Sequence, residues 1–171
     1  MEALENLLTR RSVRKYKPEQ ISDEELGAVL RAGTYAPSGK NRQSAIIVAV
    51  QNKADVEELR RLNQRFLGAS SDPFYGAPTV LVVLARADSP HAVQDGSLVL
   101  GNLFNAAHAV GLASCWINRA KEVFDTPEGK ALLKKWGVEG EYVGVGHCIL
   151  GYGAESPQAA PRKADYTRVI K

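Results

Sequence analysis

The chain has 171 residues, 44% hydrophobic and 24% charged, a composition typical of ordinary globular proteins. Its 22 basic and 19 acidic residues leave a net charge of +3, which is too small to indicate a nucleic-acid-binding protein by itself. We expect a single domain over residues 1–171 in the cytoplasm. No apolar run has the length of a membrane span or forms a signal-peptide core, and neither Cys115 nor Cys148 has a CxxC partner.

The chain opens with a short amphipathic helix, predicted from apolar residues at helical spacing between residues 2 and 9. A basic stretch, residues 10–17, follows with five cations and no acid, so its charge is not neutralised locally. If this stretch is extended, Arg10, Ser12 and Arg14 lie on one face. Because an arginine fork suits a phosphate group, the stretch is either an anion site or the solvated end of a helix.

The second predicted helix has a complete start signal, in which Ser22 caps the helix and Glu25 closes a capping box. Pro37 disfavours helical geometry at the residue before it, so we expect the helix to end near Tyr35. Residues 36–43 form a polar loop that contains glycine. Its composition favours a plain turn, and the alternative is a loop that contacts a ligand.

Two apolar runs, residues 44–50 and 79–85, predict buried strands. Between them, Asn52 can cap a helix whose apolar face points inward and extends to Phe66. The segment between this helix and the second strand, residues 68–78, is expected to be irregular.

The longest helix is predicted at residues 94–110, after a short connection of about residues 86–93. It is apolar nearly all round, and such a helix must be covered on all sides. Because one small sheet can cover only one side, we expect a second copy of the chain to cover the other. We interpret His108 as a core or interface residue of this helix rather than as a ligand.

The remaining elements follow at short intervals. The sequence predicts a strand at residues 113–117, helices at 119–124 and 126–136, and a last strand at 141–152. The C-terminal tail, about residues 155–171, ends in a polar and basic segment that we expect to be extended.

The sequence contains little that is arranged for acid–base catalysis. It has no HExxH, GxSxG or P-loop motif and no carboxylate pair at a defined spacing. His91, His108 and His147 have no recognisable nucleophile or metal partner, so no metal site is predicted. A protein of this kind either binds a ligand or takes its chemistry from a cofactor.

Five blocks of the sequence, in the same order and over nearly the whole chain, resemble the FMN-dependent nitroreductase family. They are Arg-Arg-Ser-Val-Arg-Lys-Tyr at residues 10–16, Ala-Pro-Ser-Gly-Lys-Asn-Arg-Gln at 36–43, the long helix with Asp95-Gly96-Ser97, Asn102-Leu103 and Val110-Gly111-Leu112, then Ser-Cys-Trp-Ile at 114–117 and Pro-Arg-Lys at 161–163. Each block alone is a weak signal, whereas together they are a strong one.

The resemblance implies a small, short-lid member with an α+β fold, a sandwich in which helices flank a mainly antiparallel sheet. It also implies an intertwined homodimer with two shared FMN sites and with each tail reaching over the partner subunit. The activity implied is that of an NAD(P)H-dependent FMN oxidoreductase. Hydride would pass through flavin N5 to an electron-poor acceptor such as a nitroaromatic or a quinone, in a ping-pong cycle.

The resemblance also assigns cofactor contacts at the phosphate end. Arg10, together with Arg162 and Lys163 of the tail, would hold the FMN phosphate. Arg11 and Ser12 would contact phosphate or ribityl oxygens.

At the ring end, Arg14 would approach the N1–C2=O edge of the flavin, where a cation stabilises the charge of the reduced ring. Ile117 and Asn118 would lie behind the flavin, with a backbone amide near Asn118 directed at N5. No side chain would be catalytic, because the flavin performs the chemistry. The other subunit would contribute Pro37, Ser38, Gly39 and Asn41.

Two departures from the family pattern concern the substrate pocket. Gln43 is followed by Ser-Ala rather than the frequent Pro-Trp, and the connection at residues 86–93 replaces helices that roof the pocket in larger members. Neither the acceptor nor the choice between NADH and NADPH is therefore predicted. The alternatives are a flavin-binding carrier or sensor without turnover, and a nucleic-acid binder through residues 10–17. The balanced charge and the lack of interleaved aromatic residues disfavour the latter.

Overall fold

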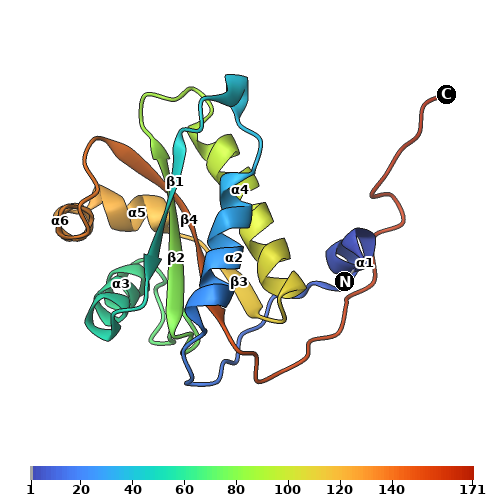
Figure 1. The fold of residues 1–171 in the computed structure, drawn as a ribbon, viewed down its shortest axis with the longest axis horizontal. Coiled ribbons are helices and arrows are strands. Elements are labelled where there is room, and N and C mark those ends of the chain that lie inside the picture. Colours follow the sequence, from blue (N-terminus) through green and yellow to red (C-terminus); the bar gives the residue numbers. More distant parts are fainter. Residues whose placement is uncertain (1) are drawn as a thin grey trace.

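A computed structural model describes residues 2–171, in which a four-stranded sheet lies between two layers of helices (Figure 1). The strands are β1 (Ala45–Val50), β2 (Thr79–Arg86), β3 (Ala113–Ile117) and β4 (Tyr142–Gly151), in the spatial order β1-β2-β4-β3. Every neighbouring pair of strands is antiparallel, so the predicted α+β fold with a mainly antiparallel sheet is confirmed.

Helices cover both faces of the sheet and carry the N-terminus beyond it. α2 and α4 lie on one face and α3, α5 and α6 on the other, while α1 lies outside the sandwich next to the tail (Figure 1). The helices are α1 (Ala3–Thr9), α2 (Asp23–Thr34), α3 (Lys53–Arg65), α4 (Ala92–Ala109), α5 (Ala120–Asp125) and α6 (Pro127–Lys135). A 3₁₀ turn, Gly39–Asn41, lies between α2 and β1.

The central strand β2 joins two hydrophobic cores, because its successive side chains point to opposite faces. Leu81 and Val83 pack in the core beneath α2 and α4. Val80, Val82 and Leu84 pack in the core on the side of α3, α5 and α6. All five side chains are fully buried, so the predicted second buried strand is confirmed.

The predicted helix signals also form as expected. The amide of Glu25 donates to Ser22 Oγ at 3.2 Å, and the amide of Ser22 donates to Glu25 Oε2 at 2.9 Å, which completes the capping box at the start of α2. α2 ends with Tyr35 at its C-cap. Asn52 Oδ1 accepts hydrogen bonds from two amides at the start of α3.

Three sequence predictions were wrong in detail. β1 is a half-buried edge strand rather than a buried one, because only β2 pairs with it. Phe66 does not face inward but is 43% exposed, since it lies at the C-cap where the chain leaves α3. α4 begins at Ala92, two residues before the predicted start at residue 94, so the connection from β2 is even shorter than expected.

A glycine on β4 allows the start of α5 to lie directly against the sheet. The register between β2 and β4 shifts next to Gly144, and a Cβ at Gly144 would lie 2.3 Å from the carbonyl oxygen of Ala120. Only glycine permits this approach, which fixes where the chain turns between β3 and α5. Within residues 2–171, no helix has both the length and the apolar character needed to cross a membrane.

His147 on β4 is completely buried between two aromatic rings. Its ring lies 5.6 Å from that of Phe74 and 6.2 Å from that of Phe124, measured between centroids. Burial lowers the pKa of His147 to about 4, because the interior disfavours the charged form. The side chain is therefore neutral at neutral pH.

This burial predicts that stability depends on pH. The pKa of His147 is about 4 in the folded chain and near 6.5 in the unfolded chain. At pH values between these two, the unfolded chain binds more protons than the folded chain. The free energy of unfolding should therefore fall by about 2 kcal/mol as the pH falls from about 7 to about 4.5. Urea unfolding followed by circular dichroism, at fixed protein concentration, measures the difference.

The matched variants separate His147 from other titrating groups. His147→Asn should lose most of the pH difference, whereas His108→Gln should keep most of it because His108 is only partly buried. Equal stability of the wild-type chain at the two pH values would contradict the prediction.

Candidate functional site

The basic stretch, residues 10–17, begins at the C-cap of α1 and then runs extended, with Ser12 paired with Ser114 of β3. The amide of Val13 donates to the carbonyl of Ser114 on β3 at 3.1 Å. The amide of Arg14 donates to the carboxylate of Glu155, after the end of β4, at 2.6 Å. These bonds fix the backbone on both sides, while the side chain of Arg14 remains exposed.

A groove of about 630 Å³ opens where the basic stretch meets the tail, and we name it the Arg162 groove. Its polar lining consists of Arg10, Arg11, Ser12 and Arg162. Apolar side chains of α1 and the tail, including Leu8 and Tyr166, form the rest. No carboxylate of the described residues lines it, so the groove suits an anion.

The two arginines at the start of the stretch have different surroundings. The guanidinium of Arg10 lies over the ring of Phe104 on α4, 6.0 Å from its centroid, which is the distance of a cation–π contact. Arg11 Nη1 donates to the carbonyls of Leu8 and Arg10 at 2.8 and 2.7 Å. Arg11 therefore stabilises the end of α1, which leaves it fewer donors for a ligand.

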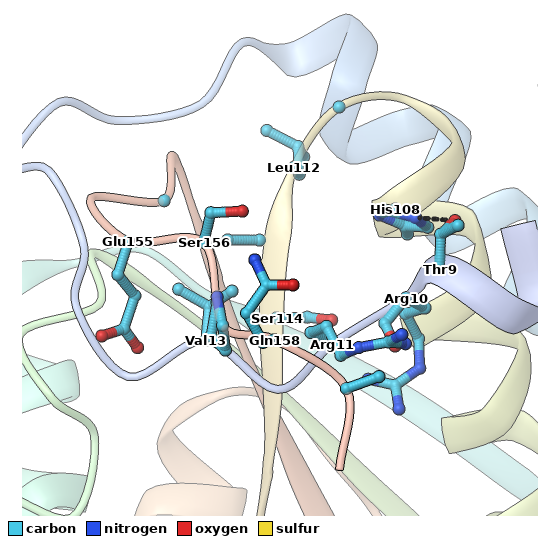
Figure 2. Close-up of a pocket in the computed structure, with 15 residues that line it drawn as sticks. Thr9, Arg10, Arg11, Val13, His108, Leu112, Ser114, Glu155, Ser156 and Gln158 are labelled. Carbon is cyan, nitrogen blue, oxygen red and sulfur yellow. Dashed lines mark hydrogen bonds between the residues drawn. The ribbon is translucent and has the colours of Figure 1, made fainter. Parts of the chain in front are cut away.

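A second cavity, of about 550 Å³, shares Arg10 and Arg11 with the Arg162 groove. Figure 2 shows Thr9 and His108 at one end of this cavity and Glu155 at the other. Thr9 Oγ1 and His108 Nε2 are hydrogen-bonded at 2.9 Å. Partial burial, with the charges of Arg10 and Arg11, lowers the pKa of His108. His108 is thus a neutral partner that joins the end of α1 to the end of α4.

A third cavity, of about 330 Å³, lies at the end of β3, and we name it the Asn118 cavity. Arg14 lines it together with Ile117 and Asn118, the residues expected behind a flavin ring. Its remaining walls come from Cys115 and Trp116 of β3, from Arg119, and from Leu67 and the irregular loop of residues 68–78 that follows it. The structure therefore groups the three residues assigned to the ring end.

The loop of residues 68–78 was not recognised from the sequence as part of the site. Asp72 accepts hydrogen bonds from the amides of Phe74 and Gly76 at 2.8 and 2.7 Å, which closes a tight turn. Tyr75, at the tip of this turn, lines the Asn118 cavity with a left-handed backbone, φ 53°. The Asp-Pro-Phe-Tyr-Gly sequence is a turn signal that could have drawn attention to it.

The segment between β3 and α5 is held by buried side chains. Asn63 Nδ2 donates to the carbonyl of Asn118 at 2.9 Å, and Arg119 Nε donates to Asn63 Oδ1 at 3.0 Å. His147 Nδ1 lies 3.3 Å from the carbonyl oxygen of Ile117. Neither Asn63 nor His147 was identified as a site residue from the sequence, because both act through contacts distant in the chain.

The loop of residues 36–43 is fixed by a buried carboxylate at the start of α4. Asp95 accepts hydrogen bonds from the amide of Gly39 at 2.9 Å and from Ser44 Oγ at 3.1 Å. Three non-glycine residues of the loop adopt positive φ, namely Lys40, Asn41 and Gln43. A loop with this many left-handed residues is more strained than an ordinary turn, and whether it contacts a ligand stays a prediction.

Within one chain the structure separates this loop from the phosphate-end residues. Pro37 and Ser38 line a groove of about 420 Å³ between α2 and β1. The 3₁₀ turn that contains Gly39 and Asn41 lies at the opposite end of α4 from α1 (Figure 1). Lys163 is exposed on the tail and does not line the Arg162 groove.

The cations that line the Arg162 groove and the Asn118 cavity are not neutralised by acidic side chains. The ion pairs found among residues 2–171 lie on other parts of the surface, and none includes Arg10, Arg14 or Arg162. Both cavities therefore present positive charge and favour a ligand that is anionic or becomes so.

The chain resembles known proteins over most of its length. The sequence model of the Nitroreductase family matches residues 7–152. A protein of Archaeoglobus fulgidus with the provisional name NADH dehydrogenase/NAD(P)H nitroreductase is 31% identical over 155 residues, which cover 88% of this chain and 85% of that protein.

Two solved structures have the same fold. A nitroreductase of Bacteroides fragilis, crystallised with bound FMN, is 33% identical, with a TM-score of 0.89 and 100% of both chains covered. An FMN-dependent nitroreductase of Clostridium difficile is 26% identical, with a TM-score of 0.80 and coverage of 98% and 99%.

The contacts of Asp95 predict how the loop of residues 36–43 responds to its loss. Asp95→Ala leaves the Gly39 amide without its charged acceptor and should lower the free energy of unfolding by about 1.5–3 kcal/mol. The amides of residues 38–43 should also exchange faster with solvent, which hydrogen-exchange mass spectrometry measures. Asp88→Ala removes an exposed carboxylate paired with Arg86 and should change stability much less, because a surface ion pair contributes little. Equal effects of the two substitutions would show that Asp95 does not anchor the loop.

Proposed function

The chain belongs to the nitroreductase family, and on that premise we propose that it is an NAD(P)H-dependent FMN oxidoreductase. Residues 1–171 form a single FMN-binding domain in this proposal. The observation that carries it is the placement of two positively charged cavities along one extended segment, with Arg10 and Ser12 lining one and Arg14 the other.

The Arg162 groove fits the phosphate end of FMN. Arg10 and Arg162 offer permanently charged, planar donors, and Ser12 offers a hydroxyl. A phosphate requires several donors and no competing carboxylate, and the lining of this groove meets both requirements. Arg11 also lines the groove but its Nη1 is engaged by two carbonyls, and Lys163 adds positive charge outside the lining.

The Asn118 cavity fits the ring end. Apolar and aromatic side chains, including Pro73 and Tyr75, supply surface for a flat ring. Arg14 can place its charge at the N1–C2=O edge, and the amide of Asn118 can donate to N5. Its one carboxylate, Asp72, accepts hydrogen bonds from the backbone of its own turn, which offset part of its negative charge.

When bound, FMN would supply the redox chemistry, namely hydride uptake from NADH or NADPH at N5 and delivery to an electron-poor acceptor such as a nitroaromatic or a quinone. The side chains of this protein would bind and orient the reactants, and no titrating side chain is required. The connection between β2 and α4 is too short to form a roof, so the pocket is open to acceptors of different shape.

We further propose that the active form is a homodimer that shares its FMN sites. Apolar side chains remain exposed on α1 and α4, including Leu8 at 73% and Leu98 at 47%. The tail carries Val169 and Ile170 at 77% and 90% exposure, and we propose that it reaches over the partner subunit. The loop of residues 36–43 would then complete the partner's FMN site. The free, buried cysteines are compatible with the cytoplasmic location that we include in the proposal.

The proposal is tested by the flavin of the purified protein and by its reduction. The protein should be yellow, heat should release FMN, and anaerobic stopped-flow mixing with NADH or NADPH should bleach the flavin. A quinone or nitroaromatic should then restore the colour. A protein that binds FMN but is not reduced by either nicotinamide would be a carrier or sensor, and failure to take up FMN would overturn the proposal.

The two arginines should have separable effects. Arg10→Ala removes a charge-assisted phosphate contact and should weaken FMN binding about ten- to a hundredfold, with the potential of the bound flavin nearly unchanged. Arg14→Ala should lower the flavin potential and slow its reduction beyond any loss of affinity, because the reduced ring loses its cation. Fluorescence titration and dye-linked potentiometry measure the two quantities.

Lys15→Ala is the matched control, since it removes an exposed cation of the same segment that lines neither cavity. It should change neither quantity appreciably. If Arg14→Ala reduces affinity alone, Arg14 is a second phosphate ligand and the proposed placement of the ring is wrong.

The dimer should be visible in solution. Light scattering should give about twice the chain mass of 18.5 kDa at every practical concentration, because a core-like interface of large area binds tightly. Leu98→Glu places a charge in the proposed interface and should shift the protein towards monomer, whereas Lys130→Glu, on the exposed side of α6, should not. A wild-type monomer that binds FMN would contradict the shared site.

A further inference from the structure

The chain leaves β3 through residues 117–119, and two buried side chains hold the carbonyl groups of this segment from inside. His147 on β4 reaches the carbonyl of Ile117, and Asn63 on α3 reaches the carbonyl of Asn118. His147 and Asn63 both have 0% exposed surface. The segment therefore turns its carbonyl oxygens towards the core and lines the Asn118 cavity with its other side.

Peptide geometry then determines where the amides point. Residues 2–171 contain no cis peptide bond, and in a planar trans peptide the N–H group points opposite to the carbonyl. The N–H groups of Asn118 and Arg119 therefore point away from the core, towards the cavity. Among residues 2–171 neither of these amides donates to a backbone or side-chain acceptor. Two neighbouring donors thus remain available to a ligand.

The backbone of Arg119 shows that this arrangement is maintained at a cost. Its φ of 72° is left-handed, which costs a residue with a side chain about 1–2 kcal/mol. Arg119 is the N-cap of α5, yet its side chain does not cap the helix and instead donates to Asn63. Helix capping therefore does not explain the conformation. Left-handed residues next to right-handed ones make successive N–H groups converge, as in backbone anion sites.

The surroundings of His147 identify which of its nitrogens carries the proton. Nδ1 faces the carbonyl of Ile117, and Nε2 has no hydrogen-bonding partner among the described residues. Phe74 and Phe124 pack against the ring. A proton on Nδ1 satisfies the carbonyl, whereas a proton on Nε2 would bury an unpaired donor and set two acceptors against each other. His147 is therefore a neutral donor to the segment.

We propose that Asn63 and His147 are positioning residues that aim the amide N–H groups of Arg119 and Asn118 at the acceptor edge of the flavin, N5 and the C4 carbonyl oxygen. This inference rests on the proposed function, since it requires FMN with its ring in the Asn118 cavity. It assigns a role in the redox site to two side chains that cannot touch the cofactor. Their effect is transmitted by the carbonyls of Ile117 and Asn118.

The test observes the hydrogen bond at N5 directly. Full-length protein is reconstituted with ¹⁵N-labelled FMN, and the N5 resonance of the oxidised flavin is recorded by NMR, since a hydrogen bond to N5 moves it upfield. Asn63→Leu removes both contacts of Asn63 with little change in volume, and His147→Leu removes the donor to Ile117. Both substitutions should move the N5 resonance downfield and slow flavin reduction by NADH, by up to about a hundredfold.

Two matched variants separate positioning from general damage. His147→Asn retains a donor where Nδ1 lies and should keep the wild-type N5 resonance. Asn102→Leu removes an asparagine that likewise donates to a backbone carbonyl, that of Ala32 at 3.0 Å, at the contact between α2 and α4. It should also leave the N5 resonance unchanged. If Asn63→Leu does not fold, Asn63→Asp keeps the shape and the acceptor for Arg119 while removing the donor to Asn118.

The outcomes distinguish this inference from the proposed function. Wild-type protein that binds FMN, together with Asn63 and His147 variants whose N5 resonance is unchanged, would overturn the inference and leave the oxidoreductase proposal intact. Wild-type protein that does not take up FMN would overturn both. An N5 shift in Asn102→Leu as large as that in Asn63→Leu would mean that the effect is global rather than positional.

Discussion

The backbone pairing of residues 12–16 with β3 on one side and with the segment after β4 on the other is the constraint on which the site depends. An extended segment has no freedom to shift by one residue when both sides are hydrogen-bonded, because its side chains would then change faces. Val13 is buried by this pairing and Arg14 is exposed. The same pairing holds Glu155, at the beginning of the tail, next to Arg14, and the tail continues from there to Arg162.

The polar groups around the two cavities are arranged for binding rather than for proton transfer. Arg10, Arg14 and Arg162 have no ion-pair partner among residues 2–171, and two of the histidines have specific structural contacts. His108 bonds to Thr9, and His147 supports the end of β3. An FMN oxidoreductase needs such an arrangement, because charge and orientation, rather than a side-chain acid or base, assist hydride transfer.

Backbone strain is concentrated around the Asn118 cavity and the loop of residues 36–43. Tyr75 and Arg119, which both line the cavity, have positive φ, as do three residues of the loop. Arg119 donates to Asn63 directly, whereas Asp72 and Asp95 hold the amides of Gly76 and Gly39 next to the other strained residues. Such strain persists only where the surroundings over-determine the conformation, which is common at functional sites.

Features that depend on neighbours within a few residues were determined by the sequence alone. The capping box of Ser22 and Glu25, the cap at Asn52 and the alternation along β2 belong to this group, because each involves contacts within one element or its period. The edge position of β1 could not be predicted, since an apolar run does not reveal how many strands will pair with it. Only the resemblance to a family placed residues from distant blocks in one cofactor site.

The tertiary structure decided which distant residues meet. It placed Arg162 beside Arg10, the turn at Asp72 opposite Asn118, and Asn63 under the carbonyl of a residue 55 positions away. Such contacts arise from the packing of whole helices and loops on the sheet, and a local pattern carries no information about them. Whether a polar residue such as Asn63 or His147 faces solvent or supports a site is therefore decided by the fold.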